Sequence, residues 1–167
     1  MPSSGITIRK ADPADAAHFV LFNTAMAWET ESLKLDEAAI RAGVDGLFRK
    51  PQYGFYVVAE HDGAVAGGLM ITFEWSDWRN KVFWWLQSVY VLPERRGKGI
   101  YRALYEGVKR LAMADGECCG FRLYVEKSNL AAQQVYAKLG MEESHYAMFE
   151  DRLETDLGKG EAGPSHR

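Results

Sequence analysis

The sequence has little cysteine and no long apolar run. Cys118 and Cys119 are its only cysteines, and they are neighbours. Neighbouring cysteines rarely form a strain-free disulfide, and this pair lacks the spacing of a zinc site, so we expect reduced, partly buried strand residues and no metal. No run approaches the roughly 18 continuous apolar residues of a membrane span. The first residues also lack an apolar signal region, so we expect no membrane contact and a cytoplasmic location.

A basic excess is also missing. The net charge is −3 and the isoelectric point is about 5.8, whereas a surface that follows nucleic-acid phosphates normally carries clustered basic residues. We therefore expect no nucleic-acid partner, although a local anionic ligand remains compatible with this charge. The apolar content of 47% is that of a globular protein. The length suits a single domain, placed at residues 1–155, and residues 156–167 form a tail that is expected to be disordered.

The hydrophobic pattern of the first half predicts strands and two helices. Alternating residues predict an opening strand at 5–11, and Asp12 followed by Pro13 predicts a helix start. Asp36 is expected to cap a second helix. A hairpin is then predicted from the strands 54–60 and 65–75, and a polar loop with Trp75 and Trp78 at its edges follows.

The second half predicts alternating strands and helices. Residues 81–93 are apolar almost throughout, as expected for a central strand covered on both faces. We then expect an amphipathic helix at 100–112, a strand at 120–126, a short helix capped by Ser128 or Asn129 and ending before Gly140, and a last strand at 145–151. This order predicts an α/β (α+β) fold with a mixed, mostly antiparallel central sheet flanked by helices.

A glycine-rich turn joins the central strand to the amphipathic helix. Such a turn directs unpaired N–H groups and the positive end of a helix dipole at one spot, which suits a phosphate. Gly97 and Gly99 let the backbone approach a ligand. An ordinary turn with a solvated basic face is the alternative, and neither the P-loop nor the dinucleotide pattern is present. Positive charge comes from Arg95, Arg96, Lys98 and Arg102.

Two motifs in this region resemble those of a known family. The segment "RGKGIY" follows the pattern Gln/Arg-x-x-Gly-x-Gly/Ala, except that Tyr101 occupies the last position. Further along, the pattern Asn-x-x-Ala-x-x-x-Tyr, with glycine four residues later, is met in full. Both patterns are typical of the GCN5-related N-acetyltransferases (GNAT), which the chain resembles over residues 5–150. The second pattern is carried by Asn129, Ala132, Tyr136 and Gly140.

The resemblance implies the GNAT fold and acetyl-CoA as the cofactor. In the family, the strand before the loop splays away from its neighbour, and its backbone pairs with the pantetheine arm like an added strand. The amides of the loop hold the pyrophosphate. The implied cofactor-binding residues are Val89, Tyr90 and Val91 on the strand, Arg96, Gly97, Lys98, Gly99, Ile100, Tyr101 and Arg102 in the loop, and Asn129 and Tyr136 downstream.

Acetyl transfer to an amine poses two proton problems. The leaving CoA thiolate gains from a general acid, a role that the resemblance gives to Tyr136, although a tyrosine on this apolar helix stripe could also be core. The amine, with a pKa of about 10.4 if it resembles lysine, must lose a proton. Many family members carry a glutamate for this at the position that Trp85 occupies here, so either the base comes from elsewhere, through a water, or the amine is weakly basic and needs no strong base. The candidate bases are Glu74 and Asp77 first, and Glu29 and Glu31 second; for each, a solvated surface carboxylate is the alternative.

Acceptor recognition is assigned to aromatic residues. Core packing explains Trp84 and Trp85, whereas Trp75 and Trp78 border a polar loop and are candidates for an acceptor pocket, together with Trp28 and Glu29. The sequence thus predicts an enzyme that transfers acetyl from acetyl-CoA to a primary amine of a small molecule or peptide, by direct attack in a ternary complex. A CoA-binding module without catalysis and an aromatic surface for a homodimer or a partner are the alternatives.

Overall fold

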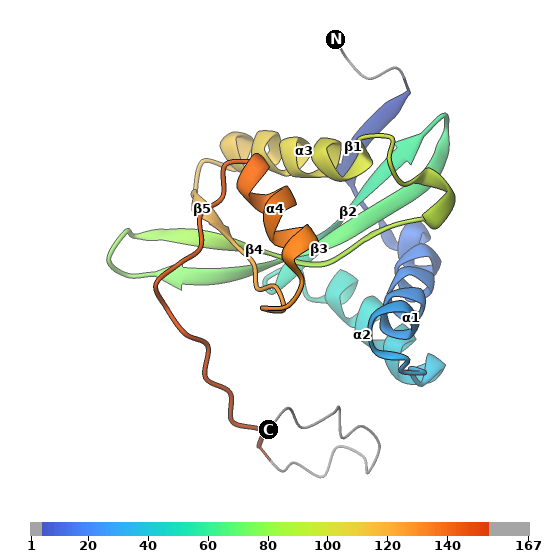
Figure 1. The fold of residues 1–167 in the computed structure, drawn as a ribbon, viewed down its shortest axis with the longest axis horizontal. Helices are drawn as coiled ribbons and strands as arrows, with labels where there is room; N and C mark the ends of the chain where they lie inside the picture. Colours follow the sequence, from blue (N-terminus) through green and yellow to red (C-terminus); the bar gives the residue numbers. More distant parts are fainter. Residues whose placement is uncertain (1–4, 154–167) are drawn as a thin grey trace. The chain divides into compact units, whose positions relative to one another are not determined.

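A computed structural model of the chain describes residues 5–153 (Figure 1). The chain divides into two compact units, one through Asn129 and the other from Leu130 onward. The tail expected at 156–167 lies outside the described residues. The first unit contains β1 (Ile6–Lys10), η1 (Pro13–Asp15), α1 (Ala16–Glu31), α2 (Glu37–Arg49), β2 (Gly54–His61), β3 (Ala64–Ser76), β4 (Lys81–Val91), η2 (Pro93–Arg95), α3 (Ile100–Asp115) and β5 (Cys118–Arg122), and the second contains α4 (Leu130–Lys138).

The first two helices begin where the sequence predicts them. The Asp12 carboxylate accepts the Ala14 N–H (2.8 Å), and the Asp15 carboxylate accepts the Asp12 N–H (2.9 Å), which completes a capping box. Arg9 donates to both oxygens of Asp15 (2.8 and 3.0 Å), and this hydrogen bonding lowers the pKa of the largely buried Asp15 carboxyl. Asp36 caps α2 by accepting the Ala38 N–H (3.3 Å).

The central sheet is mixed, as the sequence predicts. Its strands lie in the order β1-β2-β3-β4-β5; the first four are antiparallel neighbours, and β5 runs parallel to β4. Helices α1 and α2 cover part of one face and α3 covers the other (Figure 1). This arrangement places the glycine loop, between β4 and α3, at the edge where the chain passes from the sheet to a covering helix.

Two apolar layers hold the helices on the sheet. On the α1 and α2 side, the core contains Phe19, Val20, Phe22, Val44, Tyr56, Val58 and Tyr90. On the α3 side, Leu104 and Val108 are fully buried. Gly107 of α3 faces Ile8 of β1 so closely that a Cβ at 107 would lie 2.8 Å from the Ile8 Cβ. The helix therefore packs on β1 with no room for a side chain at this point.

A β-bulge changes the facing of β4 near its end. Met70 lies opposite Gln87 and Gly68 lies opposite Tyr90, so β4 has one residue more than β3 between these two pairs. Ser88 has a φ of 51°, in the left-handed region. Tyr90 consequently packs in the core beneath α1, on the same face as Gln87.

The structure differs from the sequence prediction at several points. Trp75 lies within β3, opposite Val82, and the polar turn begins after Ser76. The strand expected at 120–126 starts and ends earlier, as β5. The prediction of a strand at 145–151 is wrong: among the described residues this segment has no strand partner, which a strand needs for its backbone hydrogen bonds.

The helix of the second unit ends as the sequence predicts. Gly140 has a φ of 89°, its N–H bonds to the Ala137 oxygen (3.0 Å), and the Met141 N–H bonds to the Tyr136 oxygen (3.1 Å). These bonds form a Schellman motif, in which glycine adopts the left-handed conformation. Across residues 5–153, the structure contains no helix whose length and apolar character would let it cross a membrane.

Candidate active site

The β4 and β5 strands pair over only part of their length. Their parallel ladder ends with Trp85 opposite Arg122, whereas the ladder between β4 and β3 continues to Val91. In the described part of the chain, no strand pairs with the β5 side of β4 from Leu86 to Val91. Apart from the Val91 oxygen, which accepts a hydrogen bond from Arg96 Nε (3.0 Å), the backbone groups on this side are therefore available to an extended ligand, as in strand addition. This stretch includes the sequence-predicted residues Val89, Tyr90 and Val91.

The glycine loop presents backbone amides to open space. Gly97 and Gly99 have φ values of 74° and 79°, and a Cβ added at either would meet no atom within 4 Å. Gly99 is the N-cap of α3, and the Ala103 N–H makes its hydrogen bond to the Gly99 oxygen (3.0 Å). The amides before Ala103 therefore point out of the helix, where the dipole favours an anion. This geometry fits the diphosphate of a CoA cofactor.

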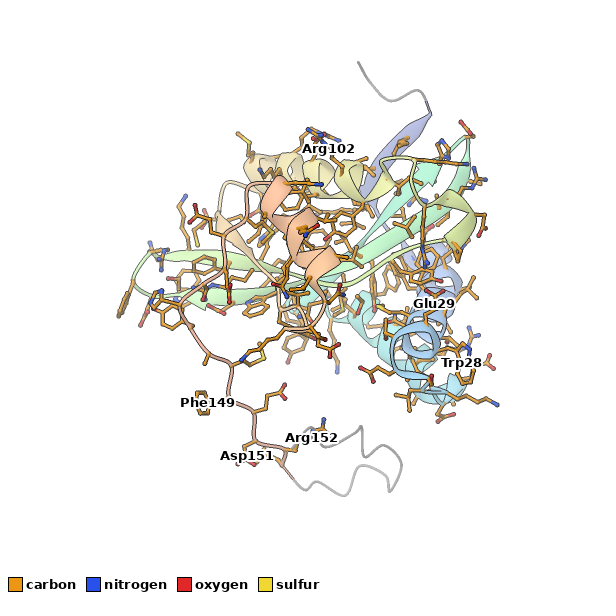
Figure 2. The ribbon with its side chains drawn as sticks, in the orientation of Figure 1. Trp28, Glu29, Arg102, Phe149, Asp151 and Arg152 are labelled. Carbon is orange, nitrogen blue, oxygen red and sulfur yellow. The ribbon has the colours of Figure 1, made fainter. Side chains whose placement is uncertain are left out.

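The arginines around the loop are held by neighbouring side chains. Arg95 lies 3.2 Å from the His61 Nδ1, and Arg102 donates to Glu106 (2.9 Å) one turn along α3. Figure 2 shows Arg102 on α3 and Glu29 near the end of α1. The positive charges predicted from the sequence are thus present around the loop, and several are already oriented by the protein.

One hydrogen-bond network joins α1, β4 and the loop. The Tyr90 hydroxyl donates to Glu29 Oε1 (2.6 Å), and Arg96 Nη2 donates to Glu29 Oε2 (2.8 Å). Arg96 Nε also donates to the Val91 oxygen (3.0 Å), and its guanidinium lies 5.3 Å from the centroid of the Tyr90 ring. The hydrogen bonds from Tyr90 and then Arg96 lower the pKa of Glu29, while burial, followed by Glu29, raises the pKa of Tyr90. The Glu29 carboxylate is therefore held ionised.

A second network lies on the part of the same sheet face that α1 and α2 leave uncovered. The Trp85 indole N–H donates to Glu74 Oε1 (3.0 Å), and Arg122 donates to the other Glu74 oxygen. The Arg122 guanidinium also lies 3.8 Å from the centroid of the Phe83 ring. Because Trp85 occupies the position at which the family resemblance places a glutamate, Glu74 brings a carboxylate next to that position from the adjacent strand.

The other predicted acceptor and base residues lie farther apart. Asp77 is in the hairpin turn, where it accepts the N–H of Trp78 (2.9 Å), and Trp78 is 89% exposed. Trp75 follows Glu74 in β3, so it points to the opposite face of the sheet. Trp28 lies on the last turns of α1, away from the β3–β4 hairpin (Figure 2). The structure therefore does not bring the tryptophans together into one wall.

The remaining predicted residues come at and after the boundary between the two units. The Asn129 N–H bonds to the Glu126 oxygen (2.9 Å), and Tyr136 is half-buried on α4. Cys118 and Cys119 are free and partly buried on β5, as expected, and burial raises the pKa of the Cys118 thiol. Residues 5–153 contain no cluster of histidine, cysteine and acidic side chains suited to a metal ion.

Sequence reasoning missed both networks. It named most of their members singly and did not name Arg122. The Glu29 contact depends on the bulge that turns Tyr90 toward α1, and the Glu74 contact depends on the register of three strands. The one signal in the sequence was Trp85, a tryptophan at a position where a carboxylate is expected. Such a replacement indicates that the carboxylate comes from a neighbouring strand.

Comparisons of sequence identify the relatives of this chain. The profile of the Acetyltransferase (GNAT) family matches residues 16–141. The thialysine N-epsilon-acetyltransferase of Bos taurus is 30% identical over 148 residues, which cover 83% of this chain and 85% of that protein. The mycothiol acetyltransferase of Tsukamurella paurometabola is 33% identical over 147 residues, which cover 83% of this chain and 49% of that protein.

Comparisons of structure agree with this result. A possible acetyltransferase from Clostridium difficile 630 superimposes with a TM-score of 0.83 at 40% identity, covering 90% of this chain and 99% of that one. AAC(6')-Iy, solved with the bisubstrate analogue CoA-S-monomethyl-acetylneamine, has a TM-score of 0.73 at 20% identity, covering 90% and 99%, and shares the fold. The chain therefore belongs to the GNAT family of N-acetyltransferases, enzymes that use acetyl-CoA as their acetyl donor.

Proposed function

We propose that this enzyme transfers an acetyl group from acetyl-CoA to a primary amine of a small molecule or peptide, by direct attack within a ternary complex. The observation that carries the proposal is the unpaired side of β4, which leads directly to a loop of outward-pointing amides at the start of α3. An extended arm and a diphosphate are the two parts of CoA that such a surface suits. The thioester of the cofactor supplies the activated acetyl group.

The cofactor-binding roles follow the elements of the site. Val89, Tyr90 and Val91 offer the strand edge to the pantetheine arm, and the amides of residues 97–102 bind the diphosphate. The Arg96 N–H, which the sequence also assigned to the diphosphate, instead bonds to the Pro93 oxygen (3.2 Å). Asn129 is assigned to the pantetheine side and Tyr136 to proton donation at the leaving thiolate, both on the basis of the family motif. A Tyr136→Phe variant should lose turnover while CoA affinity stays within about twofold, and unchanged turnover would remove the assignment.

Glu74 is our candidate for the group that takes the proton from the amine. Its carboxylate lies beside Trp85 on the uncovered part of the sheet, whereas Asp77 lies in the hairpin turn and Glu29 is held by Tyr90 and Arg96 at the start of the cofactor loop. Trp85 and Arg122 each occupy one oxygen of Glu74, and each oxygen keeps a second lone pair that can accept a proton. Glu74→Gln should lower the turnover by about 10²- to 10⁴-fold, the usual contribution of a general base.

The relatives suggest where to begin the search for an acceptor. The names of the relatives refer to thialysine and to mycothiol, and both direct attention to small molecules. We would measure CoA thiol release with L-thialysine, L-lysine, cadaverine and a lysine-containing peptide. Thermal shift with acetyl-CoA comes first, since a ligand at 100 times its dissociation constant stabilises a protein by about 2.7 kcal/mol. No shift at saturation would refute acetyl-CoA binding.

A CoA-binding module with little catalysis is the alternative function, favoured by the tryptophan at position 85 and by Tyr101 in the loop. It predicts a thermal shift with acetyl-CoA but no thiol release with any amine. A cytoplasmic location and a homodimer are further proposals from the sequence. For the dimer, size-exclusion of the wild type beside a Trp75→Ala, Trp78→Ala variant is the test, because both tryptophans are exposed.

A further inference from the structure

Arg96 is fixed by one edge of its guanidinium. The Nε and Nη2 atoms form that edge, and they donate to the Val91 oxygen (3.0 Å) and to Glu29 Oε2 (2.8 Å). The other edge, between Nη1 and Nη2, carries the remaining N–H groups, and Nη1 has no hydrogen-bond partner among residues 5–153. A guanidinium binds a phosphate best through two parallel N–H groups of one edge. The fixed edge thus leaves a complete binding edge for an anion.

Glu29 is itself held in place by β4. Its Oε1 accepts the Tyr90 hydroxyl (2.6 Å), while the Tyr90 ring packs against Phe22 of α1 at a centroid distance of 5.5 Å. Tyr90 is 6% exposed, so the hydroxyl that orients the carboxylate is part of the rigid core. The order of support therefore runs from the core through Tyr90 to Glu29, and from Glu29 to Arg96 at the start of the loop.

We propose that Glu29 is a positioning residue for the cofactor: with Tyr90, it orients Arg96 so that the free edge of the guanidinium binds the diphosphate of acetyl-CoA. This inference rests on the proposed function, because it requires CoA to bind at the glycine loop. It gives Glu29 a role at the cofactor in place of the acceptor-binding role expected from the sequence.

The direction in which CoA affinity changes when Glu29 is neutralised distinguishes positioning of Arg96 from direct charge repulsion. Glu29 carries a negative charge near a site for an anion, so its charge alone weakens CoA binding, and removing the charge should tighten it. Orientation has the opposite effect. An arginine side chain that is free to rotate loses conformational freedom when it binds, and a pre-oriented one does not. If Glu29 acts through Arg96, its neutralisation weakens CoA binding even though it removes a repulsive charge.

Isothermal titration calorimetry with CoA tests the proposal. Glu29→Gln should raise the Kd for CoA by about five- to tenfold. Glu31→Gln is the matched control, because it removes the same charge from the exposed end of α1 and the Glu31 side chain makes no hydrogen bond or ion pair within the described residues. The control should change the Kd by less than about twofold. Pantetheine, which lacks the phosphates, should bind wild type and Glu29→Gln equally.

A double-mutant cycle shows whether the effect passes through Arg96. In an Arg96→Gln background, Glu29→Gln should no longer weaken CoA binding, because the group that Glu29 orients is gone. Circular dichroism and thermal melting should show that each variant is folded. Tighter or unchanged CoA binding by folded Glu29→Gln overturns the positioning role, as does equal weakening of pantetheine binding. Failure of wild type to bind CoA at all would instead refute the proposed function.

Discussion

Replacing Gly107 with alanine should destabilise the protein, although the same change elsewhere in a helix is usually favourable. Alanine is better than glycine in a helix interior by about 1 kcal/mol. At Gly107, however, the new Cβ would lie 2.8 Å from the Ile8 Cβ and 3.0 Å from its Cγ1, with Cγ2 closer still. Carbon atoms prefer separations of about 3.5 to 4.0 Å. The α3 helix would have to move away from β1 by close to 1 Å.

The net magnitude follows from two opposing terms. Overpacking of a core typically costs about 1 to 3 kcal/mol, and the helix propensity recovers about 1 kcal/mol of this. We expect a net loss of up to about 2 kcal/mol in the free energy of unfolding, which lowers the melting temperature by up to about 8 °C for a protein of this size.

A control substitution at an exposed glycine and a second substitution at Ile8 test whether the loss of stability comes from packing. Gly43, in the middle of α2, is exposed, and a Cβ there would meet nothing within 4 Å, so Gly43→Ala should raise the melting temperature by about 2 to 4 °C. In an Ile8→Ala background, which removes the atoms nearest the new methyl group apart from the Ile8 Cβ, Gly107→Ala should cost less. A Gly107→Ala protein that melts at or above the wild-type temperature would refute the packing argument.

Two further predictions concern charge and backbone conformation. Asp15→Asn should cost about 1 to 2 kcal/mol at pH 7, because a charge-assisted pair with Arg9 is lost while the arginine stays partly solvated. Since the pKa of Asp15 is lower in the folded state, this stabilisation is complete above about pH 4, the unfolded value, and disappears as the pH falls through the folded value, so urea titrations of variant and wild type should converge in acid. Gly99→Ala should cost about 1 to 2 kcal/mol in thermal unfolding, because its φ of 79° strains an L-residue; a stability equal to wild type would mean that the loop relaxes.

Local signals in the sequence predicted most of the fold. Asp12 and Asp36 cap the starts of two helices, as their carboxylates predict. Gly140 ends a helix in the left-handed conformation, as the absence of a side chain predicts. Those features depend on residues close in the chain, so their physics can be read locally. The predicted strand at 145–151 fails for the converse reason: alternation describes how side chains would face in a sheet, but pairing requires an edge elsewhere in the chain.

The candidate site also combines features that neighbouring residues predict with features that depend on distant parts of the chain. The glycine loop was predicted from consecutive residues, and the structure places its glycines in the left-handed conformation that the motif requires. The partners of Glu74 and Glu29 were not predicted, because each contact depends on how distant strands and a helix are aligned. A surface carboxylate and an oriented one have the same sequence signature, so only the fold distinguishes them.

The bulge at Ser88 also determines which changes of chain length the site tolerates. Deleting this one residue would restore a regular ladder between β3 and β4 in which Gly68 still lies opposite Tyr90, so Tyr90 would keep its facing toward α1. Deleting Val89 as well would place Tyr90 directly after Gln87. Because successive strand residues face opposite ways, Tyr90 would then turn from α1 toward α3, and Glu29 would lose its support while the side chains of the network were all still present. A deletion of these two residues would therefore disconnect α1 from the cofactor loop without altering any residue that forms the connection, whereas a deletion of Ser88 alone would preserve it.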